Sequence, residues 1–388
     1  MSENPMDNSD LWSGLTREQV HRFEATRSVA RDSLLSLAAS GEPGRVNREL
    51  LKGMAEGGLL VRLFPSPHSG SQASATVSAV ELCLLREALA GVSTEAETAL
   101  ALQGLGAYPI LQSGQDAVKE RWIPAVARGE AVAAFALTEP DGGSDAASLT
   151  LAADRVDGGF RLTGTKKWIS NAPDADVYTI FVRTAAGNGA QGITAFALPG
   201  DADGLSGKPL QLISAHPIGE LELDGVFVRD SHVLGEVDSG FKVAMQTLDL
   251  FRPSVGAFAV GMAQAALDAS VAYAGSRQAF GKSLKDFQAI SHSLADMATS
   301  IHAARLLVYE AAAAFDEGER VTKGAAMAKL FATEMAQDVI DRAIQIHGAR
   351  GLEHGHLLEH LYRDVRATRI YEGTSEIQRE IIARELYR

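Results

Sequence analysis

The chain has 388 residues, enough for about two or three structural units around a large hydrophobic core. An apolar content of 46% and a charged content of 22% are typical of a soluble globular protein. The formal net charge of −13 argues against nucleic acid or an anionic membrane as the main partner, although a few local Arg and Lys residues suffice to bind an anionic small molecule.

Two further observations bear on location. Cys83 is the only cysteine, so no disulfide forms within the chain and we expect a cytoplasmic protein. The polar start before Arg17 does not resemble a signal peptide, and the longest uncharged run, Pro253 to Leu267, is too short to span a bilayer.

Residues 1–132 are predicted to form a helical domain. Thr16 and Gln19 make a possible capping box before a first helix, and leucines at helical spacing continue from Leu34 to Leu89. The segment Ser66 to Ser74 has the composition of a loop.

Residues 133–243 are predicted to form a β domain. Short alternating apolar runs, separated by Gly, Asp and Asn, lie at 159–163, 177–182, 193–197 and 225–228. Such spacing predicts an antiparallel sheet. Gly187 to Gly192 matches the dinucleotide pattern G-x-G-x-x-G, but it lies between two predicted strands and does not open a helix, so we interpret it as a hairpin turn.

Residues 244–388 are predicted to return to long helices, at about Pro253 to Arg277, Phe287 to Phe315 and Thr322 to His347. The third helix carries an apolar stripe at Met327, Phe331, Met335, Val339, Ala343 and Ile346. A helical block, a β block and a second helical block predict the α+β class.

A zinc site is one possible reading of the C-terminal histidines. His356 to His360 matches the pattern H-x-x-E-H, and two His at i and i+4 can share a metal on one helical face. The third ligand would have to be Glu372 or Glu376, so we favour a polar helix end without a metal. Cys83, among leucines, is predicted to be a buried apolar side chain and not a nucleophile.

The most informative stretch is Arg369 to Gln378. It places Glu372 beside a glycine and just ahead of a predicted helix, where Ser375 and Gln378 make a capping-box pattern. Burial would raise the pKa of such a carboxylate, and the positive end of the helix would lower it. Glu372 is therefore a candidate general base for removing a carbon-bound proton. The alternative is a solvated glutamate in a surface turn.

A second candidate site lies in Phe135 to Asp145 and Gly164 to Asn171. These segments supply hydroxyls, glycines that allow close approach of a ligand to the backbone, and one broad aromatic face; the residues are Thr138, Ser144, Ser170, Gly142, Gly143 and Trp168. Together they could hold a planar heterocycle with polar edges. The alternative is a set of ordinary turns between strands.

Taken together, these segments resemble the acyl-CoA dehydrogenase family, flavoenzymes that oxidise acyl thioesters. The resemblance runs in order along nearly the whole chain, through Gly106 to Leu111, Phe135 to Asp145, Trp168 to Ser170, Arg277 to Gly281, Phe287 and Gln288, Gln345 to Gly348, Tyr362 to Asp364 and Tyr371 to Thr374. It implies the family's fold: an N-terminal helical domain, a central antiparallel β domain and a C-terminal domain like a four-helix bundle.

The resemblance also implies an FAD site made by two chains. Residues of one chain would be Phe135, Leu137, Thr138, Gly143, Ser144, Trp168, Ile169, Ser170, Thr374 and Glu376, with Thr138 close to the reactive flavin nitrogen and Trp168 and Ser170 over the opposite face of the flavin. Arg277, Phe280, Gln288, Gln345 and Gly348 would reach the FAD of a neighbouring subunit. An active homo-oligomer follows, usually a tetramer built as a dimer of dimers.

The implied reaction is α,β-dehydrogenation of an acyl-CoA thioester. Glu372 would take the α-proton, flavin N5 the β-hydride, and an electron-transferring flavoprotein the electrons. The acyl-CoA channel would be lined by Ser144, Asp249, Arg252 and Gly373. Some family members place the base immediately before the residue equivalent to Arg252, but here that position is Phe251, which accepts no proton.

Alternatives remain within and beyond this family. An acyl-CoA oxidase or a dehydrogenase of carrier-protein thioesters would have the same fold, and a flavin-holding protein without acyl chemistry is a distant third. The chain departs from the usual family pattern at Ser170, at Ala349, in Pro65 to Ser74 and in Ser214 to Gly219. The last two departures leave the substrate open.

Overall fold

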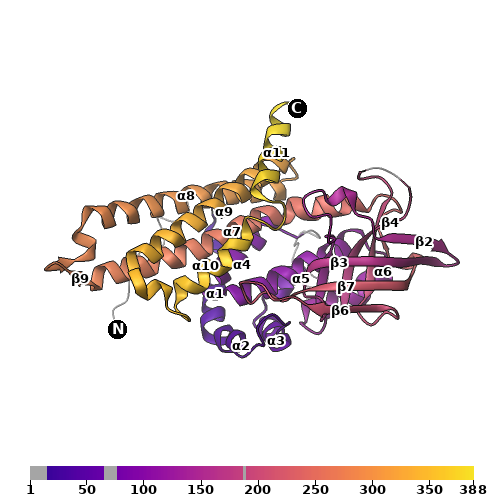
Figure 1. The fold of residues 1–388 in the computed structure, drawn as a ribbon, viewed down its shortest axis with the longest axis horizontal. Coiled ribbons are helices and arrows are strands. Elements are labelled where there is room, and N and C mark those ends of the chain that lie inside the picture. Colours follow the sequence, from indigo (N-terminus) through magenta and orange to yellow (C-terminus); the bar gives the residue numbers. More distant parts are fainter. Residues whose placement is uncertain (1–14, 65–76, 187–188) are drawn as a thin grey trace.

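The computed structural model describes residues 15–64, 77–186 and 189–388. The predicted loop at Ser66 to Ser74, the atypical segment that contains it and the first two residues of the G-x-G-x-x-G match lie outside the described residues. Helices fill both ends of the sequence and a sheet fills the middle, as the α+β prediction requires (Figure 1).

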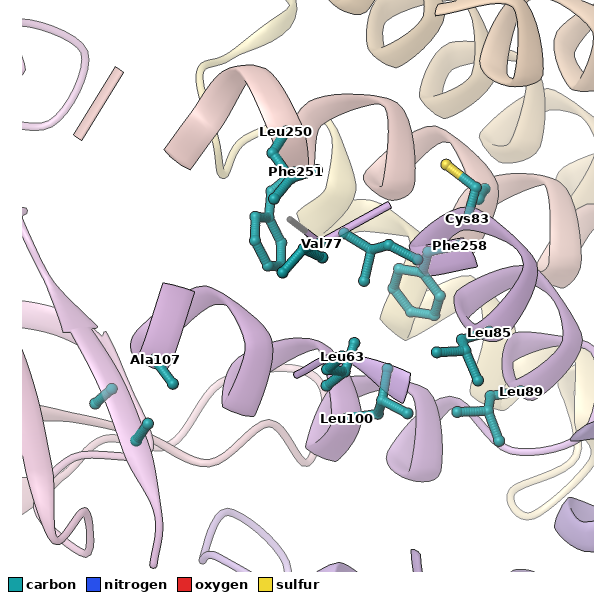
Figure 2. Packing of buried hydrophobic residues seen from close by; sticks show 14 of the residues in the cluster. Leu63, Val77, Cys83, Leu85, Leu89, Leu100, Ala107, Leu250, Phe251 and Phe258 are labelled. Carbon is teal, nitrogen blue, oxygen red and sulfur yellow. The ribbon is translucent and has the colours of Figure 1, made fainter. Parts of the chain in front are cut away.

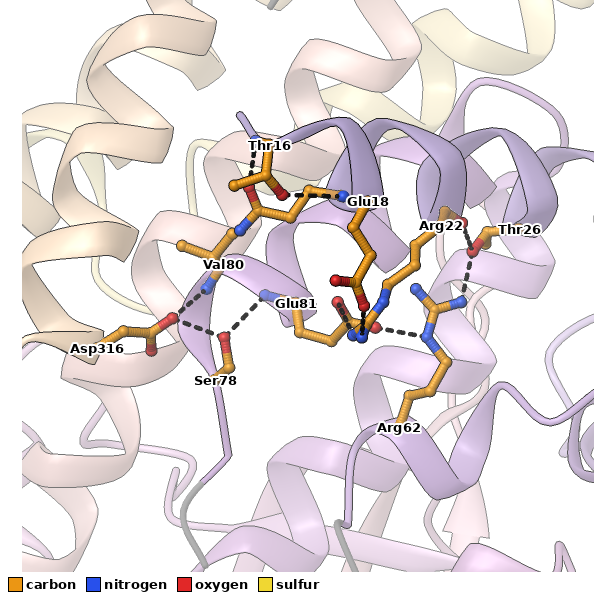
Figure 3. Close-up of polar contacts among 10 residues, drawn as sticks. Thr16, Glu18, Arg22, Thr26, Arg62, Ser78, Val80, Glu81 and Asp316 are labelled. Carbon is orange, nitrogen blue, oxygen red and sulfur yellow. Dashed lines mark hydrogen bonds and ion pairs between the residues drawn. The ribbon is translucent and has the colours of Figure 1, made fainter. Parts of the chain in front are cut away.

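The N-terminal part is helical up to Ala127. Its α-helices are α1 (Arg17–Val29), α2 (Leu35–Ala39), α3 (Arg48–Glu56), α4 (Ala79–Ala90), α5 (Thr94–Ser113) and α6 (Asp116–Ala127), with a π-helical turn at Ala30–Leu34. The predicted capping box is confirmed: Gln19 N donates to Thr16 Oγ1 at 3.2 Å, and Thr16 N donates to Gln19 Oε1 at 2.8 Å (Figure 3).

Polar contacts join α1 and α4 to distant parts of the chain (Figure 3). Arg62 donates from Nε to Glu81 at 2.5 Å and from Nη1 to Thr26 at 2.7 Å. Asp316, near the end of the C-terminal bundle, accepts from Ser78 Oγ and from Ala79 N, both at 2.6 Å. A carboxylate from the C-terminal helices thus satisfies an N–H in the first turn of α4.

The middle of the chain forms one sheet with the order β6-β7-β3-β2-β4-β5-β8, and β1 pairs with β4. The strands are β1 (Ala133–Ala136), β2 (Ala152–Val156), β3 (Gly159–Ser170), β4 (Val177–Arg183), β5 (Ile193–Pro199), β6 (Leu205–Pro209), β7 (Ile218–Arg229) and β8 (Val233–Leu234). β4 and β5 pair antiparallel in consecutive order, and the described part of the match, Gly189 to Gly192, leads into strand β5 and does not open a helix. The predicted antiparallel pairing holds for β2–β3, β3–β7, β4–β5, β5–β8 and β6–β7, whereas β1 and β2 each also pair parallel to β4.

The C-terminal part consists of α7 (Gly240–Ser276), α8 (Gln288–Asp316), α9 (Thr322–His347), α10 (Leu357–Thr368) and α11 (Ser375–Leu386), with the two-residue strands β9 (Gln278–Ala279) and β10 (Lys282–Ser283) between α7 and α8. Short 3₁₀ turns lie at Leu60–Arg62, Ala146–Ser148, Asp230–His232, Leu284–Asp286 and Gly348–Leu352. The helix predicted to begin at Pro253 begins earlier, at Gly240, and Pro253 lies inside it. The predicted stripe on α9 is buried at Met335, Val339, Ala343 and Ile346, but Phe331 is 41% exposed.

The core beside the sheet is formed by α4, α5 and α7 (Figure 2). Leu85 and Leu89 of α4 and Leu100 of α5 face Phe258 of α7. Phe251 lies about two turns earlier in the same helix. Cys83 has no exposed surface and burial raises the pKa of its thiol, so it is a core side chain as predicted.

Helix α7 is the one helix within the described ranges that is long and apolar enough to cross a membrane by composition. Of its most apolar stretch, 67% is buried inside the protein. Packing against α4, α8 and α9 therefore accounts for its apolar surface.

Candidate active site

The turn that carries Glu372 lies between α10 and α11. Glu372 and Gly373 both have left-handed backbone, with φ of 52° and 92°, and Ser375 N donates to Arg369 O at 3.1 Å to close the turn. A non-glycine residue with positive φ is uncommon and persists where its surroundings hold it.

The predicted capping box at Ser375 is wrong by one residue. Thr374 is the N-cap and accepts from Ile377 N at 3.3 Å, whereas Ser375 donates to Glu334 Oε1 at 2.6 Å. Gln378 does not reach back to a cap N–H, because its amide donates instead to the carbonyl oxygens of the turn.

Three side chains fix the carbonyl side of this turn. Gln378 Nε2 donates to the carbonyl oxygens of Glu372 and Gly373, both at 3.0 Å. Lys329 Nζ donates to Gly373 O at 2.8 Å, and Arg252 Nε lies 3.4 Å from Glu372 O. No hydrogen bond among the described residues uses the N–H of Glu372, so that donor remains available to a ligand.

Glu372 is half-buried, and one of its two carboxylate oxygens is closed off from solvent. Its Oε2 is buried and has no hydrogen-bond partner among the described residues. Burial raises the pKa of Glu372, and the cations Arg86, Lys329 and Arg252 oppose that rise. The buried Oε2 and the raised pKa argue against a fully solvated glutamate, and both are features expected of a general base.

The three cations around Glu372 are themselves buried, and each is either ion-paired or hydrogen-bonded. Arg86 is 3% exposed, forms an ion pair with Glu97 and donates to Ser254 Oγ at 2.7 Å. Burial opposes the charge of Arg86, but nearby anionic groups, Glu97 foremost, outweigh it and raise its pKa. Burial lowers the pKa of Lys329 to about 8.

Arg252, the third cation, lies beside Asp249 and the Glu372–Gly373 turn. Asp249, Arg252 and Gly373 are all residues expected in the substrate channel. Arg252 Nη1 lies 3.2 Å from Asp249 Oδ1, and its Nε faces the carbonyl of Glu372. Burial lowers the pKa of Arg252, and Asp249 and Glu372 oppose that change. The structure thus brings Asp249, Arg252 and Gly373 together with Glu372, while Ser144 lies exposed in the turn after β1.

The second candidate site follows from a buried ion pair that ties the end of β1 to β3. Lys166 has no exposed surface, and its Nζ donates to Leu137 O at 2.9 Å and to Glu139 Oε1 at 2.8 Å. Lys167 N also donates to Thr138 O at 3.0 Å. These bonds hold Phe135 to Glu139 against the strand that carries Trp168 and Ser170.

A register shift between Lys166 and Ile169 turns Trp168 outward. Trp168 has a φ of 55° and is 45% exposed, whereas Ile169 is 1% exposed. Phe135, Thr138 and Ser170 are half-buried, Leu137 is buried, and Gly143 is exposed with open space where a Cβ would lie. A flat aromatic face beside hydroxyls and an open glycine suits a planar heterocycle with polar edges.

The residues expected to reach a neighbouring subunit lie at the opposite tip of the molecule, near β9 (Figure 1). All of them are exposed: Arg277, Phe280, Gln288, Gln345 and Gly348. Tyr273 stacks on His347 with ring centroids 4.3 Å apart, which brings the ends of α7 and α9 together. At about 1.5 Å per helical residue, Arg252 and Arg277 lie roughly 38 Å apart along α7. A single chain therefore does not bring the tip residues to the site around Glu372.

The C-terminal histidines have partners of other kinds. His356 caps α10, with Nδ1 accepting from Leu358 N at 3.1 Å, and His360 Nε2 lies 2.7 Å from Thr94 Oγ1. Glu359 pairs with Arg363 at 2.7 Å. Within the described part of the chain, no three His, Cys, Asp or Glu side chains are grouped to hold a metal ion.

Sequence reasoning did not identify several residues of these sites: Arg86, Glu97, Glu139, Lys166 and Lys329. It also did not predict the bond from Gln378 to the turn. The sequence gives little signal for them, because each meets a partner far away in the chain, as Lys329 meets Gly373.

Comparison with known families covers all three parts of the chain. Residues 16–130, 134–226 and 238–387 match the N-terminal, middle and C-terminal domains of acyl-CoA dehydrogenases, in that order. The chain belongs to the acyl-CoA dehydrogenase family. The predicted family and fold are thereby confirmed.

Three relatives show the range of named activities. The chain is 36% identical to cyclohexane-1-carbonyl-CoA dehydrogenase of Geobacter metallireducens, over 96% of this chain and 98% of that protein. It is 40% identical to 3-(aryl)acrylate reductase of Clostridium sporogenes, over 87% and 90% respectively. It is 37% identical to a subunit of the caffeyl-CoA reductase–Etf complex of Acetobacterium woodii, over 88% and 90%.

Solved structures agree with this assignment. Butyryl-CoA dehydrogenase from Megasphaera elsdenii superposes with a TM-score of 0.90 at 34% identity, covering 97% of this chain and 99% of that one. PigA in complex with FAD superposes with a TM-score of 0.89 at 29% identity, covering 96% and 98%. This family member is accordingly an oxidoreductase.

Proposed function

We propose that this protein is an FAD-dependent acyl-CoA dehydrogenase in which Glu372 takes the α-proton of an acyl-CoA thioester. FAD, when bound, accepts the hydride from the β-carbon, and the product is a trans-2-enoyl thioester. The observation that carries the proposal is the Glu372 carboxylate, whose Oε2 is buried without a partner among the described residues and whose pKa is raised.

The residues beside β3 fit FAD as the cofactor. The residues that would hold the isoalloxazine ring are Trp168, through its exposed face, Thr138 and Ser170, through their half-buried hydroxyls, and the open Gly143. Thr374 and Glu376, at the start of α11, complete the same side of the cofactor site in this proposal. The FAD complex of PigA, a structural neighbour, supports this choice of cofactor.

The turn at Glu372 supplies what the thioester needs. An α-proton becomes removable when donors stabilise the negative charge that develops on the carbonyl oxygen. The N–H of Glu372, which no described group occupies, is the donor that we assign to that oxygen. Base and donor then come from one residue, whose backbone is fixed by Gln378, Lys329 and Arg252.

We further propose that a neighbouring subunit completes each FAD site, in a homotetramer like those usual in the family. The position of the tip that carries β9, far from the turn between α10 and α11 in the same chain, supports a site shared between subunits; the tip residues are Arg277, Phe280, Gln288, Gln345 and Gly348. Electron-transferring flavoprotein is the proposed electron acceptor, supported by the Etf complex of the Acetobacterium woodii relative.

A second candidate function is the reverse reaction, reduction of a 2-enoyl thioester. Two relatives of this chain are named reductases, at 40% and 37% identity. The same residues would serve, because Glu372 would then return a proton to the α-carbon. Comparing flavin reduction by saturated acyl-CoA with flavin reoxidation by 2-enoyl-CoA identifies the favoured direction.

Anaerobic titration with a panel of acyl-CoAs tests the proposal. Bleaching of the oxidised flavin band is expected with at least one member, and the substrate class follows from which member bleaches it. Glu372→Gln is expected to bind FAD and thioester but to slow bleaching on the order of 10²–10⁴-fold, because it removes the base. The matched control is Glu380→Gln, an exposed carboxylate in the second turn of α11, which should bleach like the parent protein.

Retained bleaching by Glu372→Gln would place the base elsewhere.

Admission of air to the reduced parent protein separates the alternative functions. Reoxidation of the flavin within the turnover time, without another protein, identifies an acyl-CoA oxidase. Bleaching only by acyl groups on a carrier protein identifies the carrier-linked dehydrogenase. Salt-sensitive DNA binding without bleaching by any thioester would favour a flavin-holding protein.

A further inference from the structure

An imidazole lies against one of the hydroxyls assigned to the flavin. Ser170, the last residue of β3, has its Oγ 2.7 Å from Nε2 of His216. His216 belongs to the segment Ser214 to Gly219, which departs from the usual family sequence. Nothing in the proposed reaction yet uses this contact.

The segment that holds His216 is itself fixed. Ser170 pairs with Ile218 across β3 and β7, and Asn171 N donates to Pro217 O at 2.9 Å. Arg363 of α10 donates to Ile213 O at 3.3 Å. The segment that carries His216 is therefore hydrogen-bonded to β3 after the histidine and to α10 before it, and these bonds fix the position of the imidazole beside Ser170.

The imidazole is neutral in the range where the enzyme would work. Burial lowers the pKa of His216 to about 4, and Asp364 on α10 opposes that change. A neutral imidazole has one N–H and one lone pair, and a serine hydroxyl has one O–H and two lone pairs. The pair accordingly has two arrangements, which differ in the direction of the bond between Nε2 and Oγ.

The two arrangements present different groups to a ligand. When Nε2–H donates to Ser170, the hydroxyl proton is free to donate onward. When Ser170 donates to Nε2, only its lone pairs remain, and it accepts from the ligand. An oxidised isoalloxazine offers acceptor nitrogens at its polar edge, and the reduced ring offers an N–H, so each arrangement matches one oxidation state.

We propose that His216 is a positioning residue for FAD, which limits the Ser170 hydroxyl to these two directions, one for each oxidation state of the ring, and so tunes the balance between oxidised and reduced cofactor. This rests on the proposed function, since it requires FAD to lie against Ser170. A serine without such a partner rotates and must be ordered when the cofactor changes state. His216 holds the hydroxyl in advance.

A double-mutant cycle on the FAD-bound protein tests this inference. The variants are His216→Phe, Ser170→Ala and both together, and the quantity measured is the FAD midpoint potential at equilibrium with reference dyes. His216→Phe is expected to change the ratio of affinities for oxidised and reduced FAD about tenfold, which is about 30 mV for a two-electron couple. In the Ser170→Ala background the same substitution is expected to change nothing.

His216→Gln is the conservative variant. Its amide has both a donor and an acceptor, so it is expected to restore most of the potential, and it serves as the second variant if His216→Phe fails to fold by circular dichroism. The inference is overturned if His216→Phe leaves the potential unchanged with FAD bound, or shifts it equally with and without the Ser170 hydroxyl. Failure of the proposed function has a different signature, namely wild-type protein that binds no FAD or whose FAD no thioester reduces.

Discussion

At the scale of single residues, the site is dominated by charges held away from water. Glu372 Oε2 has no hydrogen-bond partner among the described residues. The positive charges of Arg86, Lys329 and Arg252 nevertheless attract the carboxylate and lower its pKa. Each of these cations is already paired or hydrogen-bonded, to Glu97, to the Gly373 carbonyl and to Asp249. The raised pKa of the base is thus a balance in which burial exceeds the attraction of the cations.

Removing one of these cations is expected to shift the pH profile of the reaction. Arg86 lowers the pKa of Glu372, so the pair of substitutions Arg86→Met and Glu97→Gln should raise that pKa further. Since the base must be ionised, flavin bleaching rises with pH through the pKa of Glu372, and the midpoint of the rise is expected to move to higher pH. The measurement is the bleaching rate between pH 5 and 9 under anaerobic conditions.

A matched control comes from a second buried ion pair. Arg305 pairs with Glu87 at 2.8 Å, and Arg305 is not among the groups that act on Glu372. Arg305→Met with Glu87→Gln removes a comparable buried pair and should leave the midpoint of the pH profile in place. A profile that moves equally in both double variants would show that Arg86 has no specific effect on the base.

At the scale of elements, buried polar side chains decide where segments meet. Lys166 joins β3 to the end of β1 through Leu137 O and Glu139, and Glu139 also accepts from Leu151 N at 3.0 Å. Asp316, the last residue of α8, joins that helix to α4 by accepting a hydrogen bond from Ala79 N. These contacts bring together segments that the sequence separates by a strand or by a whole domain.

How far the sequence predicts such contacts depends on their range. The Thr16 and Gln19 box lies within one helical turn and was predicted in full. At α11 two adjacent hydroxyls were both suitable caps, and the choice of Thr374 over Ser375 depends on Glu334, which lies on another helix. Lys166 could not be predicted to be buried, because a lysine in an alternating strand is ordinarily exposed unless a distant carboxylate pairs with it.

Breaking the Lys166 pair is expected to destabilise the protein. Lys166→Met leaves Glu139 buried without its counterion, which costs on the order of 3–5 kcal/mol of unfolding free energy. Adding Glu139→Gln removes the unpaired charge and should recover part of that loss. Urea unfolding measures both, with Arg128→Met as the control, since the Arg128–Glu130 pair is exposed and its loss should leave the midpoint unchanged. Equal midpoints for Lys166→Met and the parent protein would contradict the structural role of the pair.

At the scale of the whole molecule, the protein is elongated, with the sheet at one end and the β9–β10 hairpin at the other (Figure 1). Phe280, at the turn of that hairpin, is 96% exposed with a φ of 51°. A fully exposed aromatic side chain at a protruding tip suits an interface with another subunit. The family resemblance implies that this tip reaches the FAD of a neighbouring subunit, and the next experiment tests that role.

Complementation between two defective variants tests the shared site. Glu372→Gln lacks the base but has an intact tip, and Arg277→Gln lacks a tip residue but has an intact base. If each site combines Glu372 of one subunit with Arg277 of its neighbour, mixed oligomers contain some sites with both residues. Random pairing of equal amounts should restore about a quarter of wild-type bleaching activity. The control pairs Glu372→Gln with Trp168→Ala: both residues are assigned to the same side of the site, so every site keeps one defect and activity should not return. No restoration in the first mixture would mean that each chain builds its site alone. Restoration in the control would mean that Glu372 and Trp168 of one site come from different subunits, which contradicts the proposed arrangement.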